Sequence, residues 1–356
     1  MFLSNAIRGA KQTMVASVSQ TRHHLKGVMT RALAVFGVSF PDATTTVREF
    51  LDPVAPGVYR VQQDGGSRVT RSGVVRVGSD FLSIDYGSFS VLRPSYWRSP
   101  GPRLHFPNVL PLWSHDWAGY YHWLIDIAPK LATAKRDLGA SAGDLVFLYP
   151  GKLGSLEVET IELLGLLPSR VIDLHQTGGV TADTIYTMPL PGFFRVHPRV
   201  CALRSAIGVQ RQPSRRLYVS RRGRRRIENE DALFAMLDKF GFEFVEDVPR
   251  SLTAQIELFA EASHIVSPHG AALSNLIWCS GNTRILELAS AIYSPEYFGA
   301  LAAECDVNYK RLVFGAGVNS WTSTAVDFTV DLDAIRRVIA EEWLLVPVVR
   351  KSSAAH

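Results

Sequence analysis

The second half of the chain alternates short apolar segments with amphipathic ones, and this alternation limits the fold more than any other feature. Gly241 stands where the first amphipathic segment should end as a helix. The predicted strands are residues 217–220, 242–246, 264–267, 284–288 and 309–314, with helices at 228–240, 251–262, 270–278 and 295–305. Strands connected by helices in this way are typical of a parallel, doubly wound sheet. Such sheets bind ligands beyond the carboxyl ends of their strands, so a site is expected in those loops.

The first half is less regular and opens with short β-prone runs among the glycines and prolines of residues 53–112. The predicted strands are 58–61, 74–77, 81–84, 104–106, 145–149, 170–174 and 184–188, with helices at 117–138, 156–166 and 198–207. Asp116 is placed to cap the first of these helices, and Pro129 should kink it because proline has no N–H to donate to the preceding turn. The basic, proline-containing stretch 210–216 predicts a domain boundary.

The length of 356 residues predicts more than one domain, because single hydrophobic cores stop growing at roughly 250–300 residues. The predicted parts are a basic N-terminal segment (1–41), an N-terminal α/β domain (42–210), a C-terminal Rossmann-like domain (211–330), and a C-terminal helix and tail (331–356).

The net charge of +5 comes from residues 1–41, which contain five basic residues and no acid. The rest of the chain is balanced, which excludes a general nucleic-acid binder that is basic over its whole surface. The basic segment is predicted either as a solvated tail or as a contact with an anionic membrane surface. No apolar stretch approaches the ~20 residues that span a bilayer, and no apolar core of a secretory signal is expected at the N-terminus.

Residues with metal-ligand spacing are scarce. Cys201, Cys279 and Cys305 are widely separated, so neither a disulfide framework nor a zinc ribbon is expected, and a reducing cytoplasm is the predicted compartment. Asp331 and Asp333 have the acid-x-acid spacing of some metal sites. They also precede the predicted helix 334–345, where acids cap the N-terminus, and the cap is the stronger interpretation.

Seven arginines lie within residues 215–226, and five of them follow the first strand of the second half. A guanidinium group can bind two phosphate oxygens, so such a loop at a strand end favours a phosphate ligand over a solvated basic loop or a nucleic-acid patch. Arg221 and Arg222 are nearest to the strand end and are the predicted phosphate ligands, with Ser220 directly before them.

Residues 267–275 (SPHGAALSN) follow the third strand and begin a short helix. Small residues such as Gly270 and Ala271 let backbone N–H groups approach an anion, and His269 can donate to a phosphate or sugar oxygen. The alternative is a tight turn whose histidine is hydrogen-bonded within the protein. The loop is neither a GxGxxG fingerprint nor a P-loop.

Glu287 lies inside the apolar strand 284–288. Burying a carboxylate there costs free energy unless it is paired or binds a ligand. Binding of ribose hydroxyl groups at the end of a doubly wound strand is one interpretation, and an internal ion pair is the other.

In the first half, His122 and Asp126 lie four residues apart, on one face of the predicted helix 117–138. Such a pair can act as a general base and the carboxylate that orients it, or with the two roles reversed. The alternative is a structural histidine among aromatic neighbours, in which case His115 or Asp116 would be the next candidate base.

Three segments, taken together, resemble glycosyltransferase family 61. Residues 119–131 (GYYHWLIDIAPKL) resemble the first family motif, and residues 218–231 (YVSRRGRRRIENED) resemble the second. Residues 267–275, followed by 285–288 (ILEL), resemble the third. The resemblance covers roughly residues 100–335, and the motifs occur in the order typical of the family.

This resemblance implies a GT-B type enzyme with two Rossmann-like domains that face a cleft, a nucleotide-sugar donor, inversion at the anomeric carbon and no tightly bound metal or other cofactor. His122 and Asp126 would act from the first, acceptor-side domain. The residues that would line the donor site in the second domain are Ser220, Arg221, Arg222, His269, Gly270, Ala271, Asn275 and Glu287.

The function expected from the resemblance is transfer of a hexosyl or pentosyl group to a glycan or lipid-linked glycan, in the synthesis of a capsular or other surface polysaccharide. The expected location is the cytoplasm, with peripheral contact at the inner face of the cell membrane through residues 1–41, and no nucleic-acid partner. Two alternatives are a non-enzymatic nucleic-acid binder that uses the arginine loop, and another nucleotide-binding doubly wound enzyme, which the missing dinucleotide fingerprint disfavours.

Overall fold

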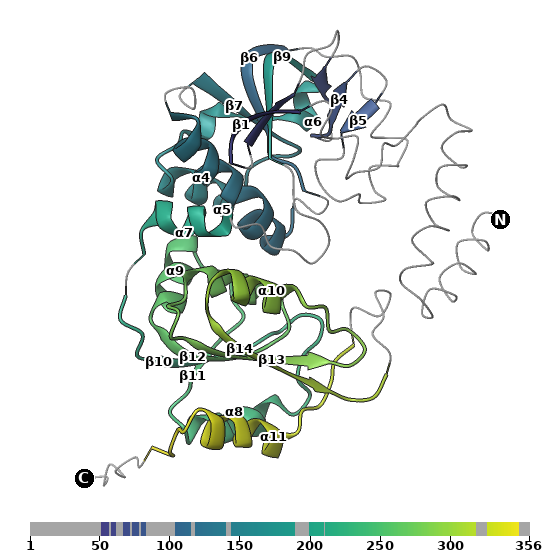
Figure 1. Cartoon of the computed structure of the whole chain (residues 1–356). Helices are drawn as coiled ribbons and strands as arrows, with labels where there is room; N and C mark the ends of the chain where they lie inside the picture. The colour runs from purple at the N-terminus through teal and green to yellow at the C-terminus, as the bar shows by residue number, and fades with distance from the viewer. Residues whose placement is uncertain are drawn as a thin grey trace, which may run out of the picture.

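The computed structural model describes residues 51–348, except for 57, 62–66, 72, 78–79, 83–103, 115–117, 140–143, 189–198, 210 and 318–325. The basic segment 1–41, His115 and the predicted cap Asp116 lie outside the described residues. Within them, the chain forms two sheets with helices between and around them (Figure 1). None of the helices described is both long enough and apolar enough to cross a membrane.

The first sheet is mixed, with the strand order β5-β4-β3-β9-β6-β7-β8. Its parallel part consists of β9 (Val180–Thr187), β6 (Leu104–Pro111), β7 (Leu145–Tyr149) and β8 (Val171–Asp173). Antiparallel strands extend it beyond β9: β1 (Leu51–Ala55), β2 (Val58–Val61), β3 (Arg68–Val69), β4 (Val75–Val77) and β5 (Asp80–Leu82). Every residue of β7 is buried, as expected for a central parallel strand.

The predicted helix 117–138 is helical from Tyr120, and its first part is a π-helical turn, η3 (His122–Ile127). This turn runs into α4 (Ala128–Asp137), where Pro129 lies in the first turn. Proline has no N–H to donate to the preceding turn, and the π-helical turn, where the regular α-helical bonding is interrupted, lies directly before α4. The other helices of this half are α5 (Ser155–Leu163), η5 (Pro168–Arg170), α6 (Leu174–Thr177) and α7 (Arg199–Ile207).

The second sheet is entirely parallel, and its order β11-β10-β12-β13-β14 confirms the predicted doubly wound arrangement. Its strands are β10 (Arg215–Val219), β11 (Glu243–Val245), β12 (Ala262–Pro268), β13 (Arg284–Ser290) and β14 (Asn308–Phe314). The strand order reverses between β10 and β12. This switch point is where open α/β sheets bind their ligands.

Helices cover both faces of the second sheet (Figure 1). One face carries α9 (Leu252–Ala260), η6 (Ala271–Trp278) and α10 (Tyr297–Glu304); the other carries α8 (Glu230–Asp238) and α11 (Leu332–Arg337), which η7 (Val338–Glu342) continues. Asp331 accepts hydrogen bonds from the backbone N–H groups of Asp333 and Ala334, at 2.9 and 3.1 Å, which confirms the predicted helix cap.

One continuous apolar core joins the two halves. It includes Trp123 and Leu131 from the first half and Leu273, Trp278 and Phe298 from the second. In Figure 1, α4, α5 and α7 lie between the two sheets and face α9 and α10. The helices that follow β12 and β13 therefore pack against the helices of the first half, and this packing places the strand ends of the second sheet beside Tyr120 and α5.

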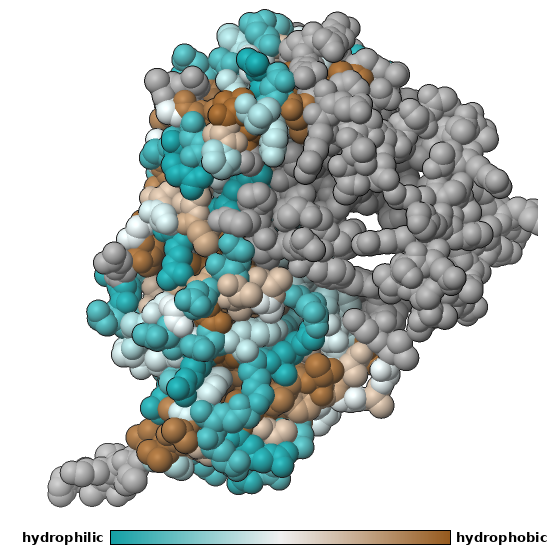
Figure 2. All heavy atoms as spheres, in the orientation of Figure 1, coloured by the Kyte–Doolittle hydropathy of each residue, from teal (hydrophilic) through white to brown (hydrophobic). Residues whose placement is uncertain are grey.

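The surface of the second half that faces the viewer in Figure 2 is mostly hydrophilic. An apolar patch lies beside the C-terminal end of the described chain, where Leu344, Val346 and Val348 are exposed. Most other large apolar side chains of this half are buried, on one face of the sheet or the other.

Candidate functional site

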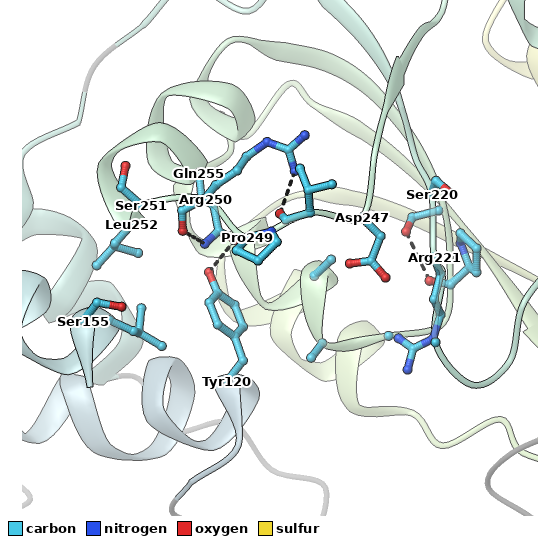
Figure 3. A pocket seen from close by; sticks show the side chains of 18 of the residues that line it. Tyr120, Ser155, Ser220, Arg221, Asp247, Pro249, Arg250, Ser251, Leu252 and Gln255 are labelled. Atoms are coloured by element: carbon cyan, nitrogen blue, oxygen red, sulfur yellow. Dashed lines mark hydrogen bonds between the residues drawn. The ribbon is translucent and has the colours of Figure 1, made fainter. Parts of the chain in front are cut away.

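A cavity of about 820 Å³ lies at the carboxyl ends of β10, β11 and β12, at the switch point of the second sheet (Figure 3). Its volume is within the range of small-molecule sites, roughly 300–1,000 Å³. Residues from the second half that line it are Ser220, Arg221, Gly223, Asp247, Val248, Pro249, Arg250, Ser251, Leu252, Gln255, Ser267, Pro268, Gly270, Ala271 and Ala272. The first half contributes Tyr120, Ser155, Leu156 and Glu159, so both halves form its walls.

Arg221 and Gly270 lie in contact at this cavity. A Cβ atom at position 270 would stand 1.7 Å from an Nη atom of Arg221, so the guanidinium group occupies space that only glycine leaves open. Burial, and secondarily the neighbouring charge of Arg225, lower the pKa of Arg221 to about 10, while Asp247 opposes this change. The group is still protonated at neutral pH, and it is a partly buried cation beside the backbone of Gly270.

Three other arginines of residues 215–226 form ion pairs and do not line the cavity. Arg222 is exposed and pairs with Glu246 at 2.8 Å, and Arg226 pairs with Asp327 at 2.8 Å. Arg215 pairs with Glu243 at 2.6 Å. Of the two predicted phosphate ligands, the structure therefore brings only Arg221 to the cavity wall. The paired charges also leave the nucleic-acid interpretation unfavoured.

Ser220 lines the cavity and donates a hydrogen bond to Glu230 at 2.8 Å. Tyr218 donates to the same carboxylate oxygen at 2.7 Å, so the first residue of α8 is tied to the end of β10. Burial, together with these contacts to Glu230, raises the pKa of Tyr218.

His269 and Glu287 form a buried pair behind the cavity wall. Nδ1 of His269 hydrogen-bonds Oε1 of Glu287, and the Tyr309 hydroxyl donates to the other carboxylate oxygen. Glu287 is fully buried and His269 is only 4% exposed. Burial and the neighbouring Glu287 raise the pKa of Tyr309. Of the two interpretations of Glu287, the internal pair is the one the structure contains, and direct contact of either residue with a donor stays a prediction.

Asn275 is also behind the wall, in a hydrogen-bond network that joins the halves. Tyr120 donates to Asn275 at 2.8 Å and contacts Gln255 at 2.9 Å, and the Asn275 amide donates to Gln255 at 3.1 Å. Burial raises the pKa of Tyr120. The side chain of Asn275 is thus occupied by contacts within the protein. Ser220, Gly270 and Ala271 line the cavity, and their contact with a donor stays a prediction.

His122 and Asp126 are brought together as the spacing predicts. Nδ1 of His122 lies 2.6 Å from Oδ2 of Asp126, and the fully buried Ser114 donates to the same oxygen at 3.0 Å. The imidazole keeps 17% of its side-chain surface exposed, whereas the carboxylate keeps 9%. An orienting carboxylate behind a partly exposed imidazole is the arrangement that a general base requires.

Aromatic contacts connect this pair with the second half. Tyr121 packs edge-on against His122 with ring centroids 5.1 Å apart, and it contacts Phe298 of α10 at 5.9 Å. Phe298 in turn lies 5.2 Å from the ring of His269. The two histidine–carboxylate pairs therefore lie on either side of one aromatic cluster between the halves.

Sequence reasoning missed Glu159, which accepts hydrogen bonds from the backbone N–H groups of Leu252 and Thr253 at 2.7 and 2.8 Å. It caps α9 from the other half of the chain, and no local signal marks such a contact. Although burial opposes the change, the hydrogen bonds from Thr253 and Leu252 lower the pKa of Glu159. Asp247 was missed as well, although an acid directly after a predicted strand is a visible signal.

Within the described parts of the chain, no group of three or more histidine, cysteine or acidic side chains is placed to hold a metal ion.

A comparison with family models matches residues 120–286 to the family described as Glycosyltransferase 61. The matched span begins at Tyr120 and includes the arginine loop and residues 267–275, parts of which line the cavity. It also contains His122 and Asp126, which do not line the cavity. A comparison with curated proteins gave no match. The match supports glycosyltransferase activity. Residues 120–286, a little under half of the chain, thus match glycosyltransferase family 61.

Proposed function

We propose that this chain is an inverting glycosyltransferase that moves a hexosyl or pentosyl group from a nucleotide-sugar to a hydroxyl group of a glycan or lipid-linked glycan. The observation that carries the proposal is the cavity between the halves, with Arg221 and Gly270 on one wall and Tyr120, two residues before His122, on the other. A GT-B type enzyme has two domains that face one cavity, and both halves of this chain line the cavity described above. The first sheet has antiparallel strands in addition to its parallel part.

In the proposed donor complex, the diphosphate lies against Arg221 and the backbone of Gly270 and Ala271. The guanidinium supplies a positive charge and paired N–H donors, and the start of η6 adds backbone dipoles. These groups stabilise the negative charge that develops on the leaving diphosphate. We therefore propose that the reaction is independent of a metal ion.

In the proposed transfer, the acceptor oxygen attacks the anomeric carbon from the face opposite the diphosphate. The new carbon–oxygen bond forms as the bond to the phosphate oxygen breaks, and the nucleoside diphosphate leaves with the electron pair. The hydroxyl proton passes to Nε2 of His122, because Nδ1 donates to Asp126. The hydrogen bond from Ser114 helps to hold the carboxylate of Asp126 beside the imidazole, where it stabilises the imidazolium.

We place this reaction in the cytoplasm, in the synthesis of a capsular or other surface polysaccharide. The acid-free segment 1–41 supports a peripheral contact with the anionic inner face of the membrane, where a lipid-linked acceptor would be presented.

A panel of nucleotide-sugars carrying uridine, guanosine, cytidine and thymidine nucleotides tests the proposal by thermal stabilisation, followed by NMR assignment of the anomeric configuration of the product. A ligand at ~100 times its Kd should stabilise the protein by about 2.7 kcal/mol. One nucleotide class should raise Tm, and its sugar should be transferred with inversion. No response to any of them, together with salt-sensitive binding to nucleic acid, would instead favour the arginine loop as a nucleic-acid contact.

A further inference from the structure

The ribose of a nucleotide donor needs hydrogen-bond acceptors for its hydroxyl groups, and Glu287 does not offer them at the cavity. Both of its carboxylate oxygens accept hydrogen bonds within the protein, one with His269 and one from Tyr309. The side chain is fully buried. Among the described residues, two acids line the cavity, Asp247 and Glu159, and the carboxylate of Glu159 already accepts two backbone N–H groups of α9.

Asp247 is the acid at the expected place in the fold. It follows β11, the second strand of the doubly wound sheet, which pairs with β10 on the side away from the switch point. In nucleotide-binding sheets of this kind, the acid after the second strand binds the ribose hydroxyl groups, while the loop after the first strand binds the phosphates. Here the loop after the first strand carries Arg221.

The side chain of Asp247 is held in position beside that phosphate ligand. It lies on the cavity wall between Pro249 and Arg221 in Figure 3. One carboxylate oxygen accepts the backbone N–H of Arg222 at 2.8 Å, and the carboxylate is close enough to Arg221 to oppose the fall in the pKa of that residue.

The loop that carries Asp247 is itself fixed. The guanidinium of Arg250 donates to the carbonyl oxygens of Glu246 and Val248 at 2.7 and 3.2 Å, and Gln255 donates to the carbonyl oxygen of Arg250 at 3.3 Å. A carboxylate held on a fixed loop needs little reorganisation when it binds a ligand, which favours specific recognition.

We infer that Asp247 binds the ribose hydroxyl groups of the donor and selects ribonucleotides over 2′-deoxyribonucleotides. This inference rests on the proposed function, since it assigns one part of the same donor site. A carboxylate can accept hydrogen bonds from both vicinal hydroxyl groups of a ribose, and removal of the 2′-hydroxyl leaves one of its oxygens without that partner.

The test measures calorimetric Kd values for UDP, GDP and CDP, and then for the 2′-deoxy form of the tightest of the three. The variant is Asp247→Asn, which keeps the shape of the side chain and an oxygen that can accept the Arg222 N–H. The matched control is Glu246→Gln, which removes one negative charge from the adjacent residue, whose side chain pairs with Arg222 outside the cavity.

The wild-type chain should bind the ribonucleotide ~10- to 100-fold more tightly than the 2′-deoxy form, the range of a hydrogen bond to a charged group. Asp247→Asn should lose most of this preference through weaker ribonucleotide binding, and Glu246→Gln should keep it. An unchanged preference in Asp247→Asn overturns the inference, and so does equal weakening of both nucleotides, which would mean that Asp247 acts only through Arg221. A wild-type chain that binds none of the three diphosphates but binds thymidine diphosphate overturns the inference alone, and one that binds none of the four overturns the proposed function as well.

Discussion

Nδ1 of His122 lies 2.6 Å from Oδ2 of Asp126, across one turn of the helix that faces the second half. An ionised carboxylate can only accept hydrogen bonds, so this contact places the proton on Nδ1 and leaves proton uptake to Nε2. Ser114, in the segment that follows β6, donates a hydrogen bond to the same oxygen. The geometry is that of a histidine oriented by a carboxylate, and turnover measurements test whether this histidine is the proposed base.

We expect His122→Ala to lower kcat by ~10²–10⁴-fold, the usual contribution of a general base, with little change in nucleoside diphosphate affinity. Asp126→Asn should also lower kcat, because an amide no longer favours the required tautomer. The matched control is His105→Ala. His105 pairs with Asp183 at 3.0 Å on the exposed surface of the first sheet, and its loss should leave kcat unchanged. Folded His122 and Asp126 variants with normal turnover would show that the pair is structural.

Arg221 and Arg222 should differ in nucleotide binding although they are adjacent. Arg221→Ala removes the guanidinium at the cavity and should weaken binding of the diphosphate by ~1.5–3 kcal/mol, the range of a charged hydrogen bond. Arg222→Ala removes an exposed partner of Glu246 and should change binding by less than about 0.5 kcal/mol. Calorimetry on both variants measures this difference, and equal losses would contradict the assignment of Arg221 alone.

Gly270→Ala should act through Arg221. The new methyl group would stand 1.7 Å from the present position of the guanidinium, so the flexible side chain must move away, at small cost to folding. We expect nucleotide affinity to fall as it does in Arg221→Ala, with Tm little changed. In the double variant the two losses should not add, because both remove the same interaction. Fully additive losses would mean that the two residues contact the ligand independently.

Activity should persist in excess chelator. The charge that develops on the leaving diphosphate is stabilised, in the proposed site, by Arg221 and the backbone at Gly270, so removal of divalent ions should change kcat by less than about twofold. The measurement is turnover in EDTA, with and without later addition of Mg²⁺ or Mn²⁺. Loss of activity that these ions restore would contradict the proposal.

Glu159 should make stability depend on pH in the acid range. The folded-state pKa of this carboxyl group is lowered from 4.5, so its contribution is present above the unfolded-state pKa and is lost as the pH falls through the folded-state pKa. Glu159→Gln should lower the free energy of unfolding by about 1 kcal/mol at pH 7, the usual worth of a helix cap, and by less under acid conditions. Glu162→Gln, on an exposed position of the same helix, is the control. Denaturant unfolding at several pH values measures the loss of unfolding free energy in each variant. A loss in Glu159→Gln that does not change with pH would contradict the role of the charge.

Local patterns determined much of this protein. The strands and helices of the second half follow from apolar periodicity, and the cap formed by Asp331 follows from the chemistry of a short acid before a helix. The pairing of His122 with Asp126 was predictable because a helix brings residues four apart onto one face, and the π-helical turn keeps them in contact. In each case the interacting groups are close in sequence, so the backbone conformation alone brings them together.

The tertiary structure decided which of these groups belong to the cavity. Arg221 and Arg222 are adjacent residues of the same type, so the sequence does not distinguish them. Gly270, at the end of a neighbouring strand, leaves room for the guanidinium of Arg221, whereas that of Arg222 pairs with Glu246 outside the cavity. The partners of Glu287 and Asn275 are likewise distant, and Tyr120 reaches Asn275 across 155 residues of sequence. A buried polar group without a hydrogen-bond partner costs free energy, so these groups pair with whichever residues the tertiary structure brings beside them. That choice depends on the packing of one half against the other, and no local pattern encodes it.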